Sequence, residues 1–297
     1  MRKRLDASKS VSKRGWVAPA AIALTSASLI GSLSGCTQQR TDEQANTALG
    51  TLVVTANGED FVREGFTTKD GWQIDFEHVY VTLDRIEAFQ SDPPFDPSKQ
   101  ARPTASQSIR IAEAPITVDL AAGGDDARPV VKTVDMAYSG RYNALAWQMV
   151  PPAEGPSAGY PLMLVGRATK GSEVINFQLQ MEEKLAFVCG DFIGDERKGF
   201  LSEGETAELE ATFHFDHLFG DGSAPADDEI NTGALGFEPI AVLAKERSEN
   251  TAEDGRVLLT SRDLQQNFSK EDYETLQTIL PSLGHVGEGH CRETQLS

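Results

Sequence analysis

The sequence has few cysteines and few positive charges, and both shortages exclude classes of protein. Three cysteines among 297 residues are too few for a disulfide-dense scaffold. Lys and Arg number 27 against 45 Asp and Glu, a net charge of −18, whereas nucleic-acid binding relies on clustered basic residues. Aromatic residues are also scarce, but a hydrophobic content of 39% is enough for a packed core and excludes wholesale disorder. The length suits one large all-β domain or two small domains.

Motifs of common enzyme classes are absent as well. The chain has no Gly-x-Ser-x-Gly nucleophile elbow, no phosphate-binding Gly-x-x-x-x-Gly-Lys, no dinucleotide-binding fingerprint and no His-Glu-x-x-His. The segment from His285 to His290, His-Val-Gly-Glu-Gly-His, approaches the inverted zinc motif His-x-x-Glu-His, but an additional glycine breaks its spacing. We therefore expect a protein that is not an enzyme.

The first 36 residues have the pattern of an export signal. A basic start is followed by an uncharged stretch rich in Ala, Ser, Leu and Ile over residues 16–33, and small residues lead to Cys36. Pro19, Gly31 and several serines interrupt the apolar stretch, which disfavours a permanent membrane span. The basic residues are Arg2, Lys3, Arg4, Lys9, Lys13 and Arg14.

The segment Leu33-Ser34-Gly35-Cys36 resembles the lipobox of bacterial lipoproteins. The resemblance implies that residues 1–35 are a signal peptide and that Cys36 receives a diacylglycerol and acyl chains such as palmitate. The protein would then be anchored in the bacterial cell envelope, facing the periplasm, through its partner, the lipid bilayer. Thr37 stands where an Asp would favour inner-membrane retention, so the outer membrane is slightly favoured. The alternative is a soluble secreted protein cut nearby, and Ser12-Lys13-Arg14 partly resembles a twin-arginine signal.

Removal of residues 1–35 makes the chain still more acidic, because it takes away six basic residues and one acidic residue and changes the net charge from −18 to −23. A surface of this charge repels anionic lipids and polyanions and attracts cations in general. Solubility or salt adaptation is the preferred explanation of this charge, so the charge alone does not predict a metal site.

Most of the remaining chain has the pattern of β-strands. Residues 36–49 are predicted to be the lipidated cysteine and a flexible polar tether, and residues 50–258 a β-sandwich domain. In the clearest strand, Ala207, Leu209, Ala211 and Phe213 share one parity and predict a buried face, opposite an exposed face with Glu208, Glu210, Thr212 and His214. Strands are expected at residues 51–56, 72–89, 108–118, 130–134, 142–150, 162–168, 173–181, 184–189 and 205–214. Many strands without helical crossovers favour a mainly β fold, an antiparallel β-sandwich.

Residues 259–297 are predicted to form a short C-terminal helical segment and a Gly/His tail packed on the sandwich. Ser269 and Asp272 resemble a helix N-cap and its N3 partner, and apolar residues then recur at helical spacing up to Pro281. A shorter helix is expected over residues 262–268. The strand sequence VYVTLDRIEAF, followed by ITVDL and GRYNALAWQM, is weakly similar to sandwich domains of unknown function in bacterial lipoproteins. This similarity implies a fold and no activity.

Two cysteines, Cys189 and Cys291, remain once Cys36 is assigned to the lipid. In an oxidising compartment they are expected to form a disulfide that closes a loop of about 100 residues. Two thiolate metal ligands are the alternative.

Four of the five histidines lie in two short segments, His214 with His217 and His285 with His290. Neutral imidazole is the commonest metal ligand in proteins, and Asp216, Asp221 or Glu288 could add an oxygen ligand or orient a histidine. This set predicts zinc or copper, with nickel also suited. The alternative is that these are hydrogen-bonded surface or turn histidines, and the fifth histidine, His78, is expected to be an ordinary sheet residue.

The disulfide and a four-histidine site conflict if strands 184–189 and 205–214 pair as a hairpin. Cys189 and His214 would then lie about 30 Å apart, whereas the chain from Cys291 back to His285 spans at most about 20 Å. The two features coexist only if these strands are not neighbours. Otherwise the disulfide takes precedence and the histidine pairs are separate.

A calcium site is a weaker prediction. The loop from Asp221 to Asn231 offers several oxygen ligands, but its spacing does not match the twelve-residue calcium loop. The sequence as a whole predicts a non-enzymatic, lipid-anchored protein that binds a transition metal for capture, delivery or sensing. The alternative is a module that binds a glycan or an envelope protein without metal.

Overall fold

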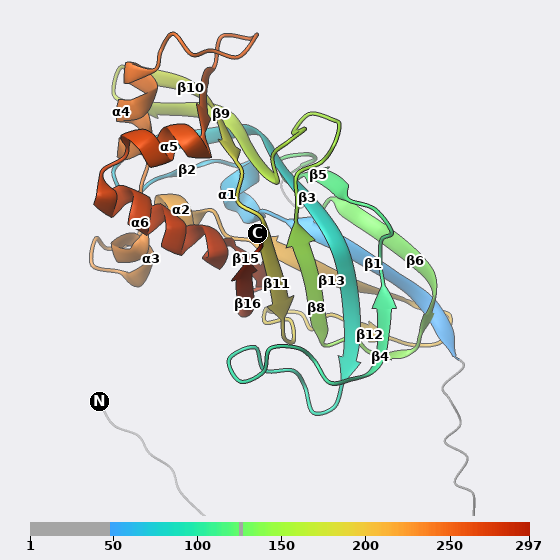
Figure 1. Cartoon of the computed structure of the whole chain (residues 1–297). Coiled ribbons are helices and arrows are strands. Elements are labelled where there is room, and N and C mark those ends of the chain that lie inside the picture. Colours follow the sequence, from blue (N-terminus) through green and yellow to red (C-terminus); the bar gives the residue numbers. More distant parts are fainter. Residues whose placement is uncertain (1–47, 125–126) are drawn as a thin grey trace, which may run out of the picture. The chain divides into compact units, whose positions relative to one another are not determined.

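The computed structural model describes residues 48–124 and 127–297 (Figure 1). These described residues form one compact unit. The predicted signal peptide, Cys36 and almost all of the predicted tether lie outside the described residues. Within the described part of the chain, no helix is long and apolar enough to span a membrane.

The chain is mainly β. Its strands are β1 (Leu49–Asn57), β2 (Phe66–Thr67), β3 (Gln73–Ser91), β4 (Ala105–Arg110), β5 (Ile116–Asp119), β6 (Val130–Tyr138), β7 (Gly140–Arg141), β8 (Ala144–Met149), β9 (Leu162–Lys170), β10 (Glu173–Met181), β11 (Leu185–Cys189), β12 (Phe200–Leu201), β13 (Thr206–Phe213), β14 (Val257–Thr260), β15 (Gly284–Val286) and β16 (Gly289–Gln295). Its helices are α1 (Glu59–Arg63), α2 (Asp216–Phe219), α3 (Glu229–Gly233), α4 (Glu238–Glu246), α5 (Ser261–Asn267), α6 (Lys270–Ile279) and the 3-10 turn η1 (Leu280–Leu283). The expected strands and the two expected C-terminal helices are present, although the expected strand over residues 108–118 is divided between β4 and β5.

The antiparallel sandwich is wrong in its arrangement. The main sheet has 14 strands in the order β14-β10-β9-β3-β8-β11-β16-β15-β13-β1-β6, with β2, β4 and β5 attached to β3. It is a mixed sheet, because β1 pairs with β13 and β10 pairs with β14 in parallel. Figure 1 shows it curled round on itself, so one continuous sheet replaces two stacked ones.

The long strand β3 takes part in both regions of the curled sheet. Its first part pairs with β9 and its second part with β8, so it connects two regions of the sheet. A hydrophobic cluster of buried residues joins the strands to helices α4, α5 and α6, and within it Trp147 stacks on Phe187 and meets Phe213 edge to face. Helices α4, α5 and α6 lie together at one end of the sheet (Figure 1).

The C-terminal segment differs most from its prediction. Residues 284–295 form the hairpin β15–β16, which is inserted into the sheet between β11 and β13 instead of lying on it as a tail. Strand β14 also crosses the boundary predicted between residues 258 and 259. The hairpin gives the backbone groups at the facing edges of β11 and β13 their hydrogen-bond partners, which is the physical reason for its place.

Candidate metal centre

The first histidine pair lies where β13 ends and the chain turns into α2. His214 follows the last residue of β13, and its backbone N–H donates to the carbonyl of Leu283 at 3.0 Å. Phe215, Leu218 and Phe219 of the same segment are fully buried in the core. Because these apolar residues anchor one side of the turn, His214 and His217 are left on the other side, with ring centroids 5.4 Å apart.

The second pair lies on the C-terminal hairpin. His285 of β15 is opposite Thr212 of β13 on one side and His290 of β16 on the other. The hairpin loop is two residues long, and its first residue, Gly287, has a φ of +57°. A Cβ at Gly287 would lie 1.9 Å from the carbonyl oxygen of Ile193, so only glycine fits this close approach.

The four imidazoles form one cluster, the histidine cluster. The ring centroid of His285 lies 4.4 Å from that of His214, 5.0 Å from that of His217 and 4.7 Å from that of His290. His214 and His285 are buried, His217 is partly buried and His290 is exposed. The two histidine pairs therefore lie together in the structure, one of the two arrangements that the sequence analysis left open.

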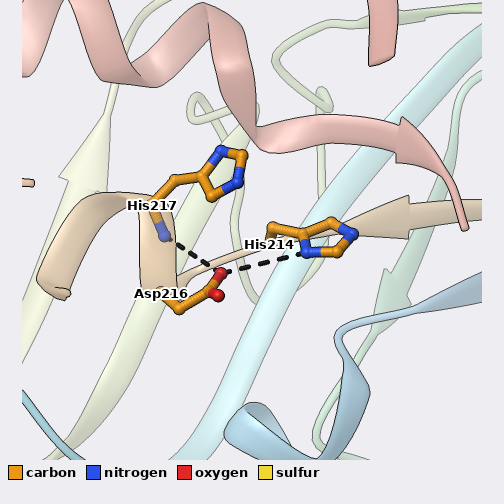
Figure 2. Close-up of side chains that lie close together, drawn as sticks. All are labelled: His214, Asp216 and His217. Carbon is orange, nitrogen blue, oxygen red and sulfur yellow. Dashed lines mark hydrogen bonds and ion pairs between the residues drawn. The ribbon is translucent and has the colours of Figure 1, made fainter. Parts of the chain in front are cut away.

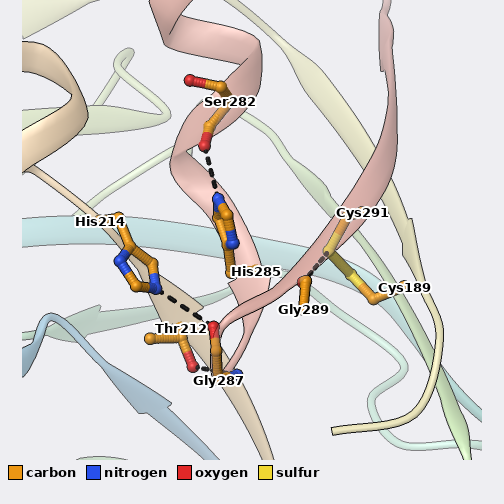
Figure 3. Close-up of a disulfide and its surroundings, with 8 residues drawn as sticks. All are labelled: Cys189, Thr212, His214, Ser282, His285, Gly287, Gly289 and Cys291. Atoms are coloured by element: carbon orange, nitrogen blue, oxygen red, sulfur yellow. Dashed lines mark hydrogen bonds between the residues drawn. A yellow bond between two sulfur atoms is a disulfide. The ribbon is translucent and has the colours of Figure 1, made fainter. Parts of the chain in front are cut away.

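Backbone carbonyls fix the orientation of three of these rings. Nε2 of His214 lies 3.1 Å from the oxygen of Gly287, and Nε2 of His285 lies 3.0 Å from that of Ser282, as Figure 3 shows. Nδ1 of His217 also lies 3.0 Å from the oxygen of Ser282. A carbonyl oxygen only accepts, so each of these nitrogens donates its hydrogen. In the neutral ring, Nδ1 of His214, Nε2 of His217 and Nδ1 of His285 are then left with a lone pair.

His285 has no partner for that lone pair among the described residues. Its Nδ1 atom is buried without a hydrogen bond, and its side chain is almost completely enclosed. Burial, with further contributions from His214, His217 and His290, lowers the pKa of His285 to about 3. Burial also lowers the pKa of His217. Both rings are therefore neutral at pH 7, which is the form that binds a metal ion.

Carboxylates border the cluster on one side. Oδ1 of Asp216 lies 3.9 Å from Nδ1 of His214 and accepts from the backbone N–H of His217 at 3.0 Å (Figure 2). Ligand atoms of His214, Asp216 and His217 lie within 4.8 Å of one another, and so do those of Glu59, His214 and Glu288. His214 belongs to both groups, so either could hold one ion at this residue.

Glu59 was not found by sequence reasoning. Its Oε2 atom lies 3.5 Å from Nδ1 of His214, and it reaches the site because β1 and β13 are parallel and end at the same edge of the sheet. Burial raises the pKa of Glu59, and the carboxylates of Glu288, Asp216 and Glu210 add to this effect against the opposing effect of His214. Glu59 also has a φ of +59°, a strained conformation for a residue with a side chain.

The exposed face predicted for β13 is wrong near the site. The buried face is confirmed by Ala207, Leu209, Ala211 and Phe213. On the other face, however, Glu210, Thr212 and His214 are buried as well. The hydroxyl of Thr212 accepts from the backbone N–H of Gly287 at 2.9 Å, so the C-terminal hairpin covers this end of the strand.

The disulfide between Cys189 and Cys291 is present together with the histidine cluster (Figure 3). The two cysteines are direct partners on β11 and β16, with their Cα atoms 4.1 Å apart. The predicted conflict does not arise, because β11 and β13 are not neighbours and the β15–β16 hairpin connects them. The disulfide thus holds the strand that carries His290, next to the strand that carries His285.

Two other residues from the sequence analysis lie apart from the cluster. Asp221 belongs to neither metal-ligand group, and its carboxylate accepts from the backbone N–H and hydroxyl of Ser223, both at 2.8 Å. In the same loop, Asp228 caps α3 and the amide of Asn231 donates to loop carbonyls, so these groups serve the turn itself. His78 lies on β3 with Nδ1 2.8 Å from Asp119 and stacks on Tyr80.

Comparisons of the chain with protein-family models, with curated proteins and with solved structures found no match. The chemistry of the site must therefore be inferred from its own atoms. Neutral imidazoles with oriented lone pairs, beside carboxylates of opposite charge to a cation, form a donor set for a divalent metal ion.

Proposed function

We propose that this protein is a non-enzymatic, metal-binding lipoprotein of the bacterial cell envelope. The ion is bound by His214, Asp216 and His217, with His285 as a further ligand and with His290, Glu59 and Glu288 at the border of the site. Capture, delivery or sensing of the metal in the periplasm is the corresponding role.

The observation that carries the metal proposal is the state of the buried His285. Its Nε2 atom donates to the carbonyl of Ser282, and its Nδ1 atom has no partner among the described residues. A buried polar atom without a partner costs about 1–3 kcal/mol, so such an atom calls for an explanation. An ion at the neighbouring His214 and His217 would use this lone pair, since their ring centroids lie 4.4 Å and 5.0 Å from that of His285. His285 itself belongs to neither group of described ligand atoms that lie within 4.8 Å of one another.

The hydrogen bonds of the other two rings point to the same conclusion. Metal-binding histidines usually donate their second ring nitrogen to a carbonyl or carboxylate, which fixes the ring and its tautomer. His214 and His217 both have such a carbonyl partner. Ordinary surface histidines have no need of this arrangement in three adjacent rings.

The donor set favours zinc or copper(II). It consists of imidazole nitrogens and carboxylate oxygens, which suit these ions and also nickel. Cys189 and Cys291 are joined as a disulfide and so supply no thiolate. Calcium, which takes six to eight oxygen ligands, is less suited to a site dominated by nitrogen.

Elemental analysis tests the metal proposal. Residues 37–297 would be purified without a histidine tag, dialysed against zinc or copper and then against metal-free buffer. We expect about one ion per chain, and loss of this ion in the double variant His214→Ala/His217→Ala. The matched control is His78→Ala, which removes the one histidine outside the cluster and should leave the metal content unchanged. If the wild-type protein contains no metal, and if zinc, copper and chelator leave its Tm unchanged, the result would instead favour a glycan- or protein-binding module.

The location is a separate proposal, which the lipobox resemblance of residues 33–36 supports. We expect the wild-type chain to sediment with the outer membrane and to be labelled by radioactive palmitate. The Cys36→Ala variant should lose the label and leave the membrane fraction. The Cys36→Ser variant, which is the closest replacement in size, should do the same. Membrane association of a correctly processed Cys36→Ala variant would contradict the lipid anchor and leave the metal proposal intact.

A further inference from the structure

A groove of about 350 Å³ lies on the outer surface of the sheet, apart from the histidine cluster. Strands β3, β8 and β11 form its floor, and the loop before β4 borders it. Three arginines line this arginine groove, namely Arg85, Arg102 and Arg110.

The arginines of this groove differ from most cations of the molecule. Many basic side chains pair with a carboxylate, as Lys198 does with Glu208 at 2.7 Å and Lys170 with Glu238 at 2.7 Å. Among residues 48–124 and 127–297, no ion pair or hydrogen bond involves the guanidinium of Arg85, Arg102 or Arg110. The chain has 45 acidic residues against 27 basic ones, so partners are abundant. Three unpaired arginines in one concavity thus form a local positive site on an acidic protein.

Arg85 is held in the groove by an irregularity of the backbone. Between Asp84 and Glu87, β3 has two residues opposite the single residue Trp147 of β8, which is a β-bulge. Arg85 has a φ of +48° at this bulge, a conformation that glycine adopts far more readily. Strained backbone of this kind gathers at binding sites, where it directs a side chain towards a ligand.

The bulge also changes which residues of β3 face outwards. Before it, Val79, Val81 and Leu83 are buried, and after it the buried residues are Ile86 and Ala88. The inward parity therefore changes from odd to even numbers. This change puts Arg85, Glu87 and Phe89 on the outer face together, where Arg110 of β4 is the direct partner of Glu87.

We propose that the arginine groove binds a small organic anion with two or more acidic groups, carboxylates or phosphates. Three guanidiniums and the single carboxylate of Glu87 leave an excess of two positive charges, and guanidinium binds both acid types in a bidentate manner. The volume is within the range of small-ligand sites, and Phe89 and Pro103 add an apolar wall. A small ligand is favoured over an anionic membrane, because a flat anionic surface would meet the net charge of −18.

Isothermal titration calorimetry with citrate and pyrophosphate tests this proposal. The full-length protein in a non-ionic detergent would be stripped of metal and dialysed, so that neither probe can bind through a metal ion. We expect saturable binding of at least one probe with a Kd below about 1 mM and no binding of acetate at that concentration. Binding should weaken as salt is added, because the arginines are exposed.

Two variants with the same change of charge separate the groove from general electrostatics. Arg85→Gln/Arg110→Gln should weaken binding at least about tenfold, whereas Lys132→Gln/Arg167→Gln, which alters exposed cations elsewhere, should change it less than about twofold. The His214→Ala/His217→Ala variant should bind the probes as the wild type does, so this result is independent of the metal proposal. Equal binding by the two charge variants, or a Kd above about 1 mM for both probes, would overturn the proposal. Binding only to vesicles that contain phosphatidylglycerol would assign the groove to a lipid headgroup and would also overturn it.

Discussion

The histidine cluster and the arginine groove lie on the same sheet but differ in the charge and the burial of their side chains. A neutral imidazole costs much less to remove from water than a charged group, which is why His214 and His285 can be buried, and burial itself keeps His285 neutral. The arginines are permanently charged, so they stay exposed on the outer face. In our proposals, the histidine cluster would replace water around a cation, and the arginine groove would bind an anion from solution.

The two regions also differ in what holds them. The histidine cluster depends on the C-terminal hairpin, which joins the sheet through pairing with β13 and through the disulfide to β11. The arginine groove depends on the bulge in β3, a continuous part of the central sheet. Changes to the hairpin should therefore affect the histidine cluster more than the arginine groove, which shares only β11 with it, and changes to the bulge should affect mainly the arginine groove.

The largest effect is expected from removal of the disulfide. The two cysteines are 102 residues apart, so the Cys189→Ala/Cys291→Ala variant should lose about 4–5 kcal/mol of unfolding free energy in the chain-entropy model. Urea unfolding with and without reducing agent measures this loss. At low temperature, where the variant is still folded, zinc affinity should fall by a larger factor than citrate affinity. An equal loss of both affinities would contradict the separation of the two regions.

Acid should destabilise the protein through the histidine cluster. The pKa of His285 is about 3 in the folded protein against 6.5 in the unfolded chain, so the unfolded state binds more protons between these values. Stability should fall by a few kcal/mol as the pH decreases from about 6.5 towards 3. In the His285→Gln variant, measured by urea unfolding at a series of pH values, this dependence should be smaller. The His78→Gln variant should retain the wild-type slope, and an identical slope in both variants would contradict the assignment.

Zinc should raise the stability of the wild type by a smaller amount. An ion that binds only the folded state adds about 2.7 kcal/mol at a free concentration of one hundred times its Kd. The increase in Tm should disappear in the His214→Ala/His217→Ala variant and decrease in Asp216→Asn. If the Arg85→Gln/Arg110→Gln variant also lost the increase, the metal would not be confined to the histidine cluster.

The smallest effect is expected at the bulge. Because glycine adopts the φ of Arg85 without strain, Arg85→Gly should raise the unfolding free energy by up to about 1 kcal/mol while it weakens citrate binding. Arg85→Ala removes the same side chain and keeps the strain, so it should weaken binding without the gain in stability. A loss of stability in Arg85→Gly would show that the conformation serves the fold and not a ligand.

Part of the fold could be predicted from the sequence because it depends on local patterns. Alternating apolar residues such as Ala207, Leu209 and Ala211 indicate a strand with one buried face, and this face is confirmed. The Ser269 cap and the apolar spacing up to Ile279 similarly indicate α6. The wrong sheet arrangement has a different origin, because alternation within a strand says nothing of whether its neighbour is parallel or antiparallel.

The candidate sites show the same division. His214, His217, His285 and His290 were found because they occur in two short segments of the sequence. Glu59 was missed because it comes to them only through the parallel pairing of β1 with β13. The arginine groove left one signal in the sequence, the change of apolar parity between Leu83 and Ile86, but three arginines from separate segments give no pattern by themselves.

The sequence alone thus determined the strand-forming segments, the C-terminal helices, the cysteine pair and the four histidines of the candidate site, since each rests on residues close together in the chain or on composition. Tertiary structure decided that the C-terminal hairpin lies between β11 and β13, and with it that the disulfide and the four histidines occur together. The reason is that strand order is set by which exposed edges find hydrogen-bond partners and which side chains fill the common core. Both are properties of the whole folded chain and of no single segment.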